Sequence, residues 1–241
     1  MTQVHFILQG KGGVGKSFVA ALLQQHFTSR NFSPIGIDTD PVNATFASYK
    51  SFNVQRLEIM RGDNINPRVF DELIEQILDD NEDSIFVVDN GAATFVPLCA
   101  YLFENNVIDF LQQQSCNINF HTVLTGGQAL NDTTNGLSNL FEHFKNVPVC
   151  VWINEYFGKL EKNGKSFEQS NLYKNNQDQI RGLIRIQEVR RETFGADLDH
   201  MLRNKLTFTE AIESSDFNVM AKQRLRMIWR DLNDQMTTLQ F

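Results

Sequence analysis

Cysteine is scarce in this sequence: Cys99, Cys116 and Cys150 are the three cysteines among 241 residues. An odd number of cysteines without C-x-x-C spacing argues against a disulfide framework and against a structural zinc site. We therefore expect the three thiols to fill space in the core. The five histidines are scattered without metal-ligand spacing, which predicts solvated or core positions for them as well.

Long apolar runs and an excess of positive charge are also missing. No stretch approaches the roughly 18 apolar residues of a membrane-spanning helix, and residues 1–9 lack the layout of a secretory signal, so we expect a cytoplasmic protein. Lys and Arg total 22 against 29 Asp and Glu, a net charge of −7, which argues against a protein devoted to coating nucleic acid. The C-terminal quarter is more basic than the rest. Solvated helix faces explain that quarter most simply, and a nucleic-acid or membrane contact is the alternative.

The apolar residues fall into short runs that alternate with stretches of helical periodicity. This alternation is typical of βαβ units that build a parallel sheet. The sequence therefore predicts a single α/β domain over residues 1–241, with a doubly wound, mostly parallel sheet and helices on both faces. The expected strands cover residues 4–8, 35–38, 85–88, 120–124, 149–153 and 182–186.

Helical spacing of apolar residues marks the segments between these strands. The first predicted helix covers residues 16–30, and a second follows Pro67, which suits the first position of a helix. Its expected buried stripe consists of Phe70, Leu73, Ile74, Ile77 and Leu78. A third helix carries the apolar residues Leu130, Leu137, Leu140, Phe141 and Phe144. The polar segment 156–166 contains Asn163-Gly164 and predicts an excursion, with a hairpin as its form.

The C-terminal segment has an apolar stripe opposed by basic residues, which is an amphipathic helix pattern. The stripe consists of Leu225, Ile228, Trp229, Leu232 and Met236. Packing of this helix against the sheet is the favoured interpretation. The alternative is peripheral contact with a membrane through the same stripe.

A glycine-rich segment between the first strand and the first helix fits the pattern G-x-x-x-x-G-K-[ST] of a phosphate-binding loop. It reads Gly10-Lys11-Gly12-Gly13-Val14-Gly15-Lys16-Ser17, and Phe18 follows in the helix. The glycines allow backbone N–H groups to point inward at phosphate oxygens, and the helix N-terminus adds partial positive charge. Lys16 is expected to neutralise the β- and γ-phosphates and Ser17 to ligate Mg²⁺. The segment 164–166, Gly-Lys-Ser, lacks a preceding strand and is predicted to be a simple loop.

Three aspartates stand at the ends of predicted strands. Asp38 and Asp40 follow the second strand at positions i and i+2, so their carboxylates share one face of an extended segment. One of them could touch hydrated Mg²⁺ and the other the attacking water. Asp89 ends the third strand and is the expected Walker B carboxylate for the water shell of the metal. Ser17, Asp38 and Asp89 are thus the candidate metal ligands, although each aspartate taken alone also suits a cap or turn.

These motifs together resemble the MinD/ParA branch of P-loop ATPases. Residues 11–17 are similar to its deviant Walker A motif, and Asp38-Thr39-Asp40-Pro41 is similar to its switch I. The resemblance implies an ATP-dependent face-to-face homodimer in which Lys11 contacts the nucleotide across the interface and Asp40 positions the attacking water. Lys11, Lys16 and Asp40 are therefore the candidate catalytic residues. Asn154 resembles the asparagine that contacts adenine in that branch, whereas residues 90–93, Asn-Gly-Ala-Ala, replace its usual proline-bearing turn.

A narrower resemblance extends over nearly the whole chain. Residues 8–17, 38–46, 125–130 and 164–169 resemble ATPases encoded in plasmid conjugative-transfer regions. This implies a bacterial protein of a mobile element, for which a conjugation or partition protein is the candidate partner. Since MinD-like relatives attach to membranes through a C-terminal amphipathic helix, peripheral contact with the inner membrane is a further alternative. The hypothesis is a dimerisation switch that binds ATP and Mg²⁺ and hydrolyses ATP slowly. A small-molecule kinase or ligase on the same loop, and a non-hydrolysing ATP-binding module, are the alternatives.

Overall fold

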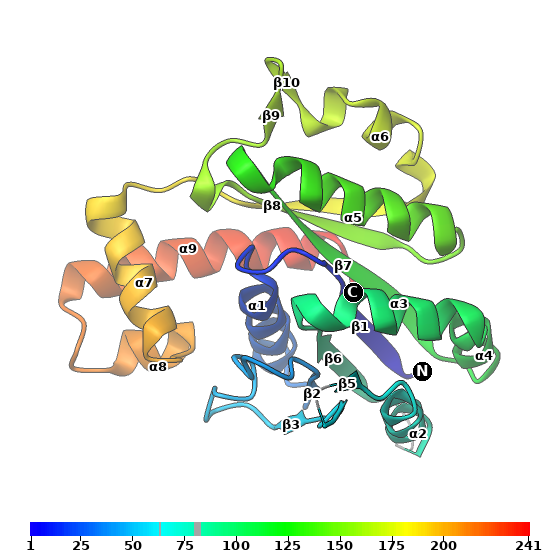
Figure 1. Cartoon of the computed structure of the whole chain (residues 1–241). Coiled ribbons are helices and arrows are strands. Elements are labelled where there is room, and N and C mark those ends of the chain that lie inside the picture. Colours follow the sequence, from blue (N-terminus) through cyan, green and yellow to red (C-terminus); the bar gives the residue numbers. More distant parts are fainter. Residues whose placement is uncertain (63, 80–82) are drawn as a thin grey trace.

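A computed structural model describes residues 1–62, 64–79 and 83–241. Its centre is a sheet of seven parallel strands in the order β11-β8-β7-β1-β6-β2-β3 (Figure 1). These strands are β1 (Gln3–Ile7), β2 (Ile35–Asp38), β3 (Val54–Arg56), β6 (Ile85–Asp89), β7 (Asn117–Thr125), β8 (Val149–Asn154) and β11 (Ile180–Ile186). All six predicted strands are present, and the doubly wound fold is confirmed. The seventh, β3, is a short and largely exposed edge strand without the apolar run that would have revealed it.

Helices cover both faces of the sheet because its central strands carry buried side chains on both sides, most of them apolar. In β1, Phe6 faces one apolar cluster and Ile7 faces the other. The first cluster is covered by α2 (Val69–Asp79), α3 (Phe95–Glu104), α4 (Val107–Gln113) and α5 (Leu130–His143). The second is covered by α1 (Lys16–Ser29), α7 (Ala196–Arg203), α8 (Phe208–Glu213) and α9 (Val219–Thr238).

The predicted excursion is a hairpin of β9 (Glu161–Lys162) and β10 (Lys165–Ser166), followed by the short helix α6 (Asn171–Lys174). Its turn residues, Asn163 and Gly164, have φ angles of 54° and 72°. Positive φ at both central residues is the geometry that an Asn-Gly hairpin turn requires. The prediction of a simple loop without a preceding strand at 164–166 was wrong, because β9 precedes this Gly-Lys-Ser segment and its last two residues form β10. A second small hairpin, β4 (Met60–Arg61) with β5 (Asn64–Ile65), was not predicted.

Two details of the predicted core need correction. Leu78 is 36% exposed rather than buried, because the buried stripe of α2 ends at Ile77, two residues before the helix does. Cys99 is only half-buried, whereas Cys116 and Cys150 lie in the core as expected. The helix after Pro67 begins at Val69, since residues 66–68 form a turn in front of it.

The C-terminal helix α9 packs on the sheet. Leu225, Leu232 and Met236 are buried in the second cluster, and the Trp229 ring stacks on Phe208 with 5.4 Å between ring centroids. The packing interpretation of the apolar stripe is therefore confirmed, and the stripe faces protein in this conformation. Within the described ranges, no helix is both long enough and apolar enough to cross a membrane.

Candidate functional site

The carboxyl ends of three neighbouring strands bring the predicted site residues together. In the parallel register, Asp89 of β6 pairs with Ile7 of β1 on one side and with Asp38 of β2 on the other. The glycine-rich loop leaves β1 at this edge and enters α1. Ligands of open α/β sheets bind outside the carboxyl ends of the strands, so this edge is the candidate site.

The loop has the backbone geometry that its glycines predict. Gly13 and Gly15 have φ angles of 74° and 105°, in a region that side chains with a Cβ rarely adopt. The helix starts directly behind them, with the Val19 amide donating to the Gly15 carbonyl at 3.0 Å. The first amides of α1 therefore point toward the loop, as an anion site requires.

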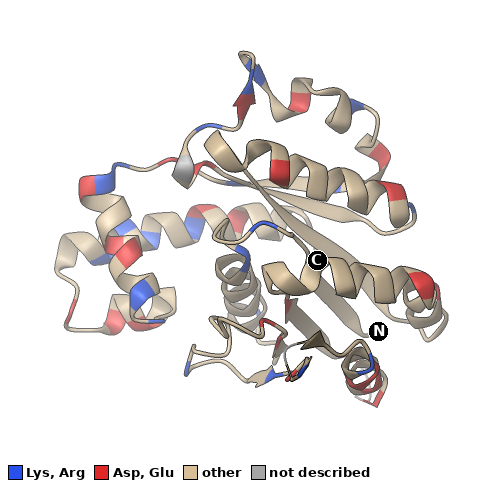
Figure 2. Ribbon diagram, viewed as in Figure 1, with Lys and Arg blue, Asp and Glu red and all other residues tan. Residues whose placement is uncertain are grey.

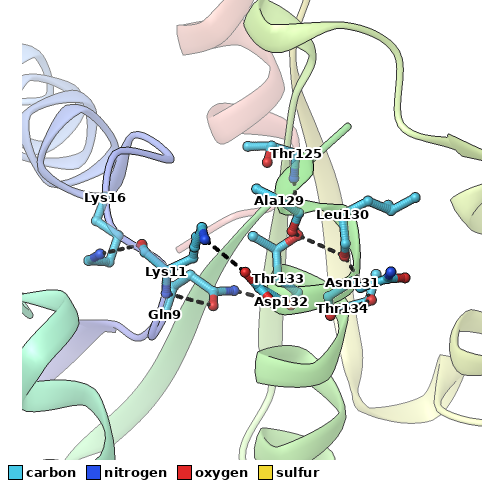
Figure 3. Close-up of polar contacts among 10 residues, drawn as sticks. All are labelled: Gln9, Lys11, Lys16, Thr125, Ala129, Leu130, Asn131, Asp132, Thr133 and Thr134. Carbon is cyan, nitrogen blue, oxygen red and sulfur yellow. Dashed lines mark hydrogen bonds and ion pairs between the residues drawn. The ribbon is translucent and has the colours of Figure 1, made fainter. Parts of the chain in front are cut away.

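Lys16 lies folded over its own loop. Its side chain is largely buried, and Nζ donates to the Lys11 carbonyl oxygen at 2.9 Å (Figure 3). Burial lowers the pKa of the Lys16 ammonium, and the carboxylates of Asp89 and Asp40 oppose that shift. A buried ammonium with one carbonyl acceptor retains two further N–H donors, which suits a phosphate ligand.

Asp89 is the most perturbed acid of the site. The pKa of its carboxyl is raised to about 7, chiefly by burial and also by the nearby Asp38, while a hydrogen bond from Ser17 opposes the rise. Its Oδ1 atom is buried and has no hydrogen-bond partner in the part of the chain that the structure describes. A buried carboxylate oxygen without a partner, beside a hydroxyl, fits the oxygen donors that Mg²⁺ prefers.

Asp38 has a second task besides its place near Asp89. Its Oδ1 accepts the Asp40 amide at 3.0 Å and its Oδ2 accepts the Ala47 amide at 2.9 Å. The carboxylate thus holds the segment after β2 in place. Across residues 1–62, 64–79 and 83–241, no group of three or more His, Cys, Asp or Glu could hold a metal ion alone. Mg²⁺ commonly completes its shell with substrate phosphates and water, which matches so sparse a protein ligand set.

Asp40 lies against the turn that replaces the proline-bearing segment. Its Oδ1 accepts the amides of Val42 and Asn43 at 2.9 and 3.0 Å. A Cβ atom added to Gly91 would lie 2.8 Å from Asp40 Cγ and 2.9 Å from its Cα, so this close approach depends on glycine. The Thr94 hydroxyl donates to the Gly91 carbonyl at 2.8 Å, and this hydrogen bond stabilises the turn.

Lys11 has an ion-pair partner in its own chain that the sequence did not indicate. Its ammonium lies 2.8 Å from the Asp132 carboxylate in the first turn of α5 (Figure 3). The two side chains are 43% and 55% exposed. Sequence reasoning missed Asp132 because nothing distinguishes it from the other surface acids.

Gln9 is a buried connection that the sequence motifs did not reveal. Its amide nitrogen donates to the Val123 carbonyl at 3.1 Å. Figure 3 shows its two other contacts: the same nitrogen donates to the Thr133 carbonyl at 3.1 Å, and Oε1 accepts the Lys11 amide at 3.3 Å. A Cβ atom on Gly136 of α5 would lie 2.6 Å from Gln9 Oε1. A glycine inside a helix destabilises it, so Gly136 was the available signal of a close approach.

Asn154 supports the loop from the end of β8. Its Nδ2 donates to the Val14 carbonyl at 2.9 Å, and its Oδ1 accepts the Tyr156 amide at 3.1 Å. The structure therefore places Asn154 beside the loop, and its contact with adenine stays a prediction.

A cavity of about 540 Å³ opens in front of the loop, within the size range of small-ligand sites. Burial, together with the nearby Asp89, raises the pKa of Tyr49 in its wall to about 12. The cavity is lined by the glycine loop, by the segments around Asp40 and Gly91, and by the corner between α7 and α8. The lining residues are Gly12, Gly13, Gly15, Lys16, Ser17, Phe18, Asp40, Val42, Asn43, Thr45, Tyr49, Ala92, Ala93, Leu202 and Lys205.

Comparison with known proteins agrees with this geometry. The CobQ/CobB/MinD/ParA nucleotide binding domain matches residues 5–204. A protein named TraL from Escherichia coli is 45% identical over 237 residues, which cover 98% of each chain. The MinD cell division protein of Aquifex aeolicus has a TM-score of 0.54 at 15% identity, over 98% of this chain and 97% of that one. The MinD protein of Pyrococcus horikoshii OT3, complexed with Mg-ADP, has a TM-score of 0.51 at 13% identity, over 99% of each chain. The chain therefore belongs to the MinD/ParA family of P-loop nucleotide-binding proteins, with TraL among its relatives.

Proposed function

We propose that this protein is an ATP-dependent dimerisation switch that hydrolyses ATP slowly and controls a partner protein in plasmid transfer or maintenance. The observation that carries the proposal is the glycine loop with Lys16 on one side of the cavity and the Ser17–Asp89 pair beneath it. Family membership supports the nucleotide, and the TraL relative supports the plasmid context.

Each site residue has a task in this proposal. Lys16 and the loop amides bind the phosphates, and Ser17 and Asp89 hold Mg²⁺, with Asp38 close enough to bind its water shell. Bound Mg²⁺ would offset the negative charge of the β- and γ-phosphates. Asp40 orients the attacking water, for which its position beside Gly91 at the cavity wall is suitable.

Lys11 acts across the dimer interface in this proposal. Its pair with Asp132 is exposed on both sides, and exposed ion pairs contribute only about 0–1 kcal/mol. The ammonium can therefore leave Asp132 for the phosphates of a second subunit at little cost. A cation supplied in this way stabilises transition-state charge and joins two faces that carry ATP.

The deciding experiment is the assembly state with ADP and with ATP, measured by light scattering on wild type and on Asp40→Ala. We expect monomers with ADP, dimers with ATP, and a persistent ATP dimer in the variant because ATP is not consumed. Monomers under all conditions would refute the switch. ATP dimers with no ADP release by wild type would instead identify a non-hydrolysing module, and a phosphorylated small-molecule product would identify a kinase or ligase.

Mixing two variants tests whether Lys11 acts in trans. A dimer of one Lys11→Ala subunit and one Asp40→Ala subunit has one site with an intact Asp40 and an intact Lys11 from the neighbour. We expect partial recovery of ATP hydrolysis on mixing. Absence of recovery at every ratio, with mixed dimers shown to form, would place the action of Lys11 within its own subunit.

A further inference from the structure

Lys205 is a basic residue in the wall of the cavity, and it belongs neither to the glycine loop nor to the segments that carry the aspartates. It lies in the corner between α7 and α8, half-buried, and lines the same cavity as the glycine loop and Asp40. Figure 2 shows basic residues at this corner and on the loop in front of α1. No hydrogen bond or ion pair of the Lys205 side chain occurs with any residue that the structure describes.

The backbone of Lys205 has a conformation that disfavours lysine. Its φ angle is 55°, and the corner forms a Schellman motif: the Lys205 amide donates to the Leu202 carbonyl at 3.2 Å, and the Leu206 amide donates to the Met201 carbonyl at 3.1 Å. The residue at this position of the motif is usually glycine and sometimes asparagine, because a Cβ is unfavourable there. A lysine in such a place costs stability, and strained residues of this kind cluster at ligand sites.

The corner is held firmly against both walls of the cavity. The Phe208 amide donates to Gln25 Oε1 of α1 at 2.8 Å, in buried surroundings. Glu210 caps the start of α8 and also accepts the Ser51 hydroxyl at 3.1 Å, which links the corner to the segment after Asp40. The backbone of Lys205 is therefore fixed relative to the loop helix and to the Asp40 segment. From this fixed backbone, the side chain of Lys205 lines the cavity.

We propose that Lys205 is a further phosphate-binding residue, which contacts the phosphate chain of the bound nucleotide from the side opposite the glycine loop. This inference rests on the proposed ATP binding and adds a cation supplied by a distant part of the chain. A half-buried lysine facing several phosphate charges contributes less than the buried Lys16 and more than a surface lysine. Its loss should therefore weaken ATP binding by about three- to tenfold.

Asparagine and arginine replacements separate charge from conformation. Lys205→Asn removes the charge but suits a positive φ, so the nucleotide-free variant should melt at the wild-type temperature or about 1–3 °C above it. Lys205→Arg keeps the charge and the backbone cost. Lys145→Asn removes an exposed lysine beyond the far end of α5 and serves as the matched control.

Calorimetric titration with Mg-ATP at 100 mM and 500 mM NaCl is the test. We expect a three- to tenfold weaker Kd for Lys205→Asn at low salt, a smaller loss at high salt, and values within twofold of wild type for Lys205→Arg and Lys145→Asn. A wild-type Kd in Lys205→Asn, or an equal loss in Lys205→Arg, would overturn the assignment. If wild type itself fails to bind ATP, the proposed function fails, and the role of Lys205 fails with it.

Discussion

Replacing Asp132 with asparagine should strengthen ATP-dependent dimerisation. The Lys11–Asp132 pair is short, at 2.8 Å, but its side chains are 43% and 55% exposed. Solvent screening reduces such a pair to about 0.5 kcal/mol. If Lys11 leaves Asp132 to reach the partner's nucleotide, two pairs are broken per dimer, so dimerisation is opposed by about 1 kcal/mol. The variant should therefore dimerise about fivefold more tightly.

The assay is a light-scattering titration of protein concentration with Mg-ATP, in the Asp40→Ala background so that ATP persists. The gain from Asp132→Asn should shrink at 500 mM NaCl, since exposed ion pairs are screened by salt. It should also vanish when Lys11→Ala is present, because the pair is then already absent. Asp109→Asn, which removes an exposed acid from the first turn of α4, is the matched control. Weaker or unchanged dimerisation of Asp132→Asn would refute the reasoning.

Three further outcomes are expected. Lys16→Ala should lose about ten- to a hundredfold in ATP affinity by calorimetry, because a charge-assisted contact contributes about 1.5–3 kcal/mol. Gly91→Ala should slow ADP release while the Kd for ATP stays within about twofold, because its Cβ would lie 2.8 Å from Asp40 Cγ and displace that side chain. Burial lowers the pKa of His5 from its ordinary 6.5 to about 3. Between these two values, His5 binds a proton in the unfolded chain but not in the folded chain. His5 should therefore lower stability by about 1 kcal/mol between pH 7 and 5.5. Asp89, whose pKa is raised to about 7, acts in the opposite direction over that range, so the effect of His5 is measured in urea titrations as the difference between wild type and a variant. His5→Gln should gain about 1 kcal/mol relative to wild type over this interval, and the exposed control His143→Gln should gain nothing.

The sequence predicts directly those parts of the site whose residues lie close together along the chain. The loop 10–17 combines its glycines, lysine and serine within eight residues, and its strand and helix neighbours show clear periodicity. Asp38 and Asp89 were predicted as site residues from their places at strand ends, and they lie close together because β2 and β6 are neighbours in the sheet. Short apolar runs that alternate with helical periodicity predicted six of the seven strands.

The parts that sequence did not reveal come from distant elements or from residues without a distinctive pattern. Asp132 and Lys205 reach the site from α5 and from the α7–α8 corner, and a single acid or lysine on a helix has no periodicity to mark it. The strand β3 was not predicted because it is short and its residues are largely exposed. Leu78 was misplaced because apolar spacing continues past the point where α2 stops facing the core.

Two contacts that connect the loop to α5 differ in strength, and this difference would allow the exchange of partners that we propose for Lys11. Gln9 is buried and links the Lys11 amide to the Thr133 carbonyl, so its loss would leave buried polar groups without partners at about 1–3 kcal/mol. The exposed Lys11–Asp132 pair contributes about 0–1 kcal/mol. The backbone of Lys11 therefore stays fixed to α5 while its ammonium is free to exchange Asp132 for a stronger anion. In the proposed dimer, a loop that keeps its shape during this exchange would preserve the phosphate site of its own subunit while Lys11 contacts the nucleotide of the other subunit.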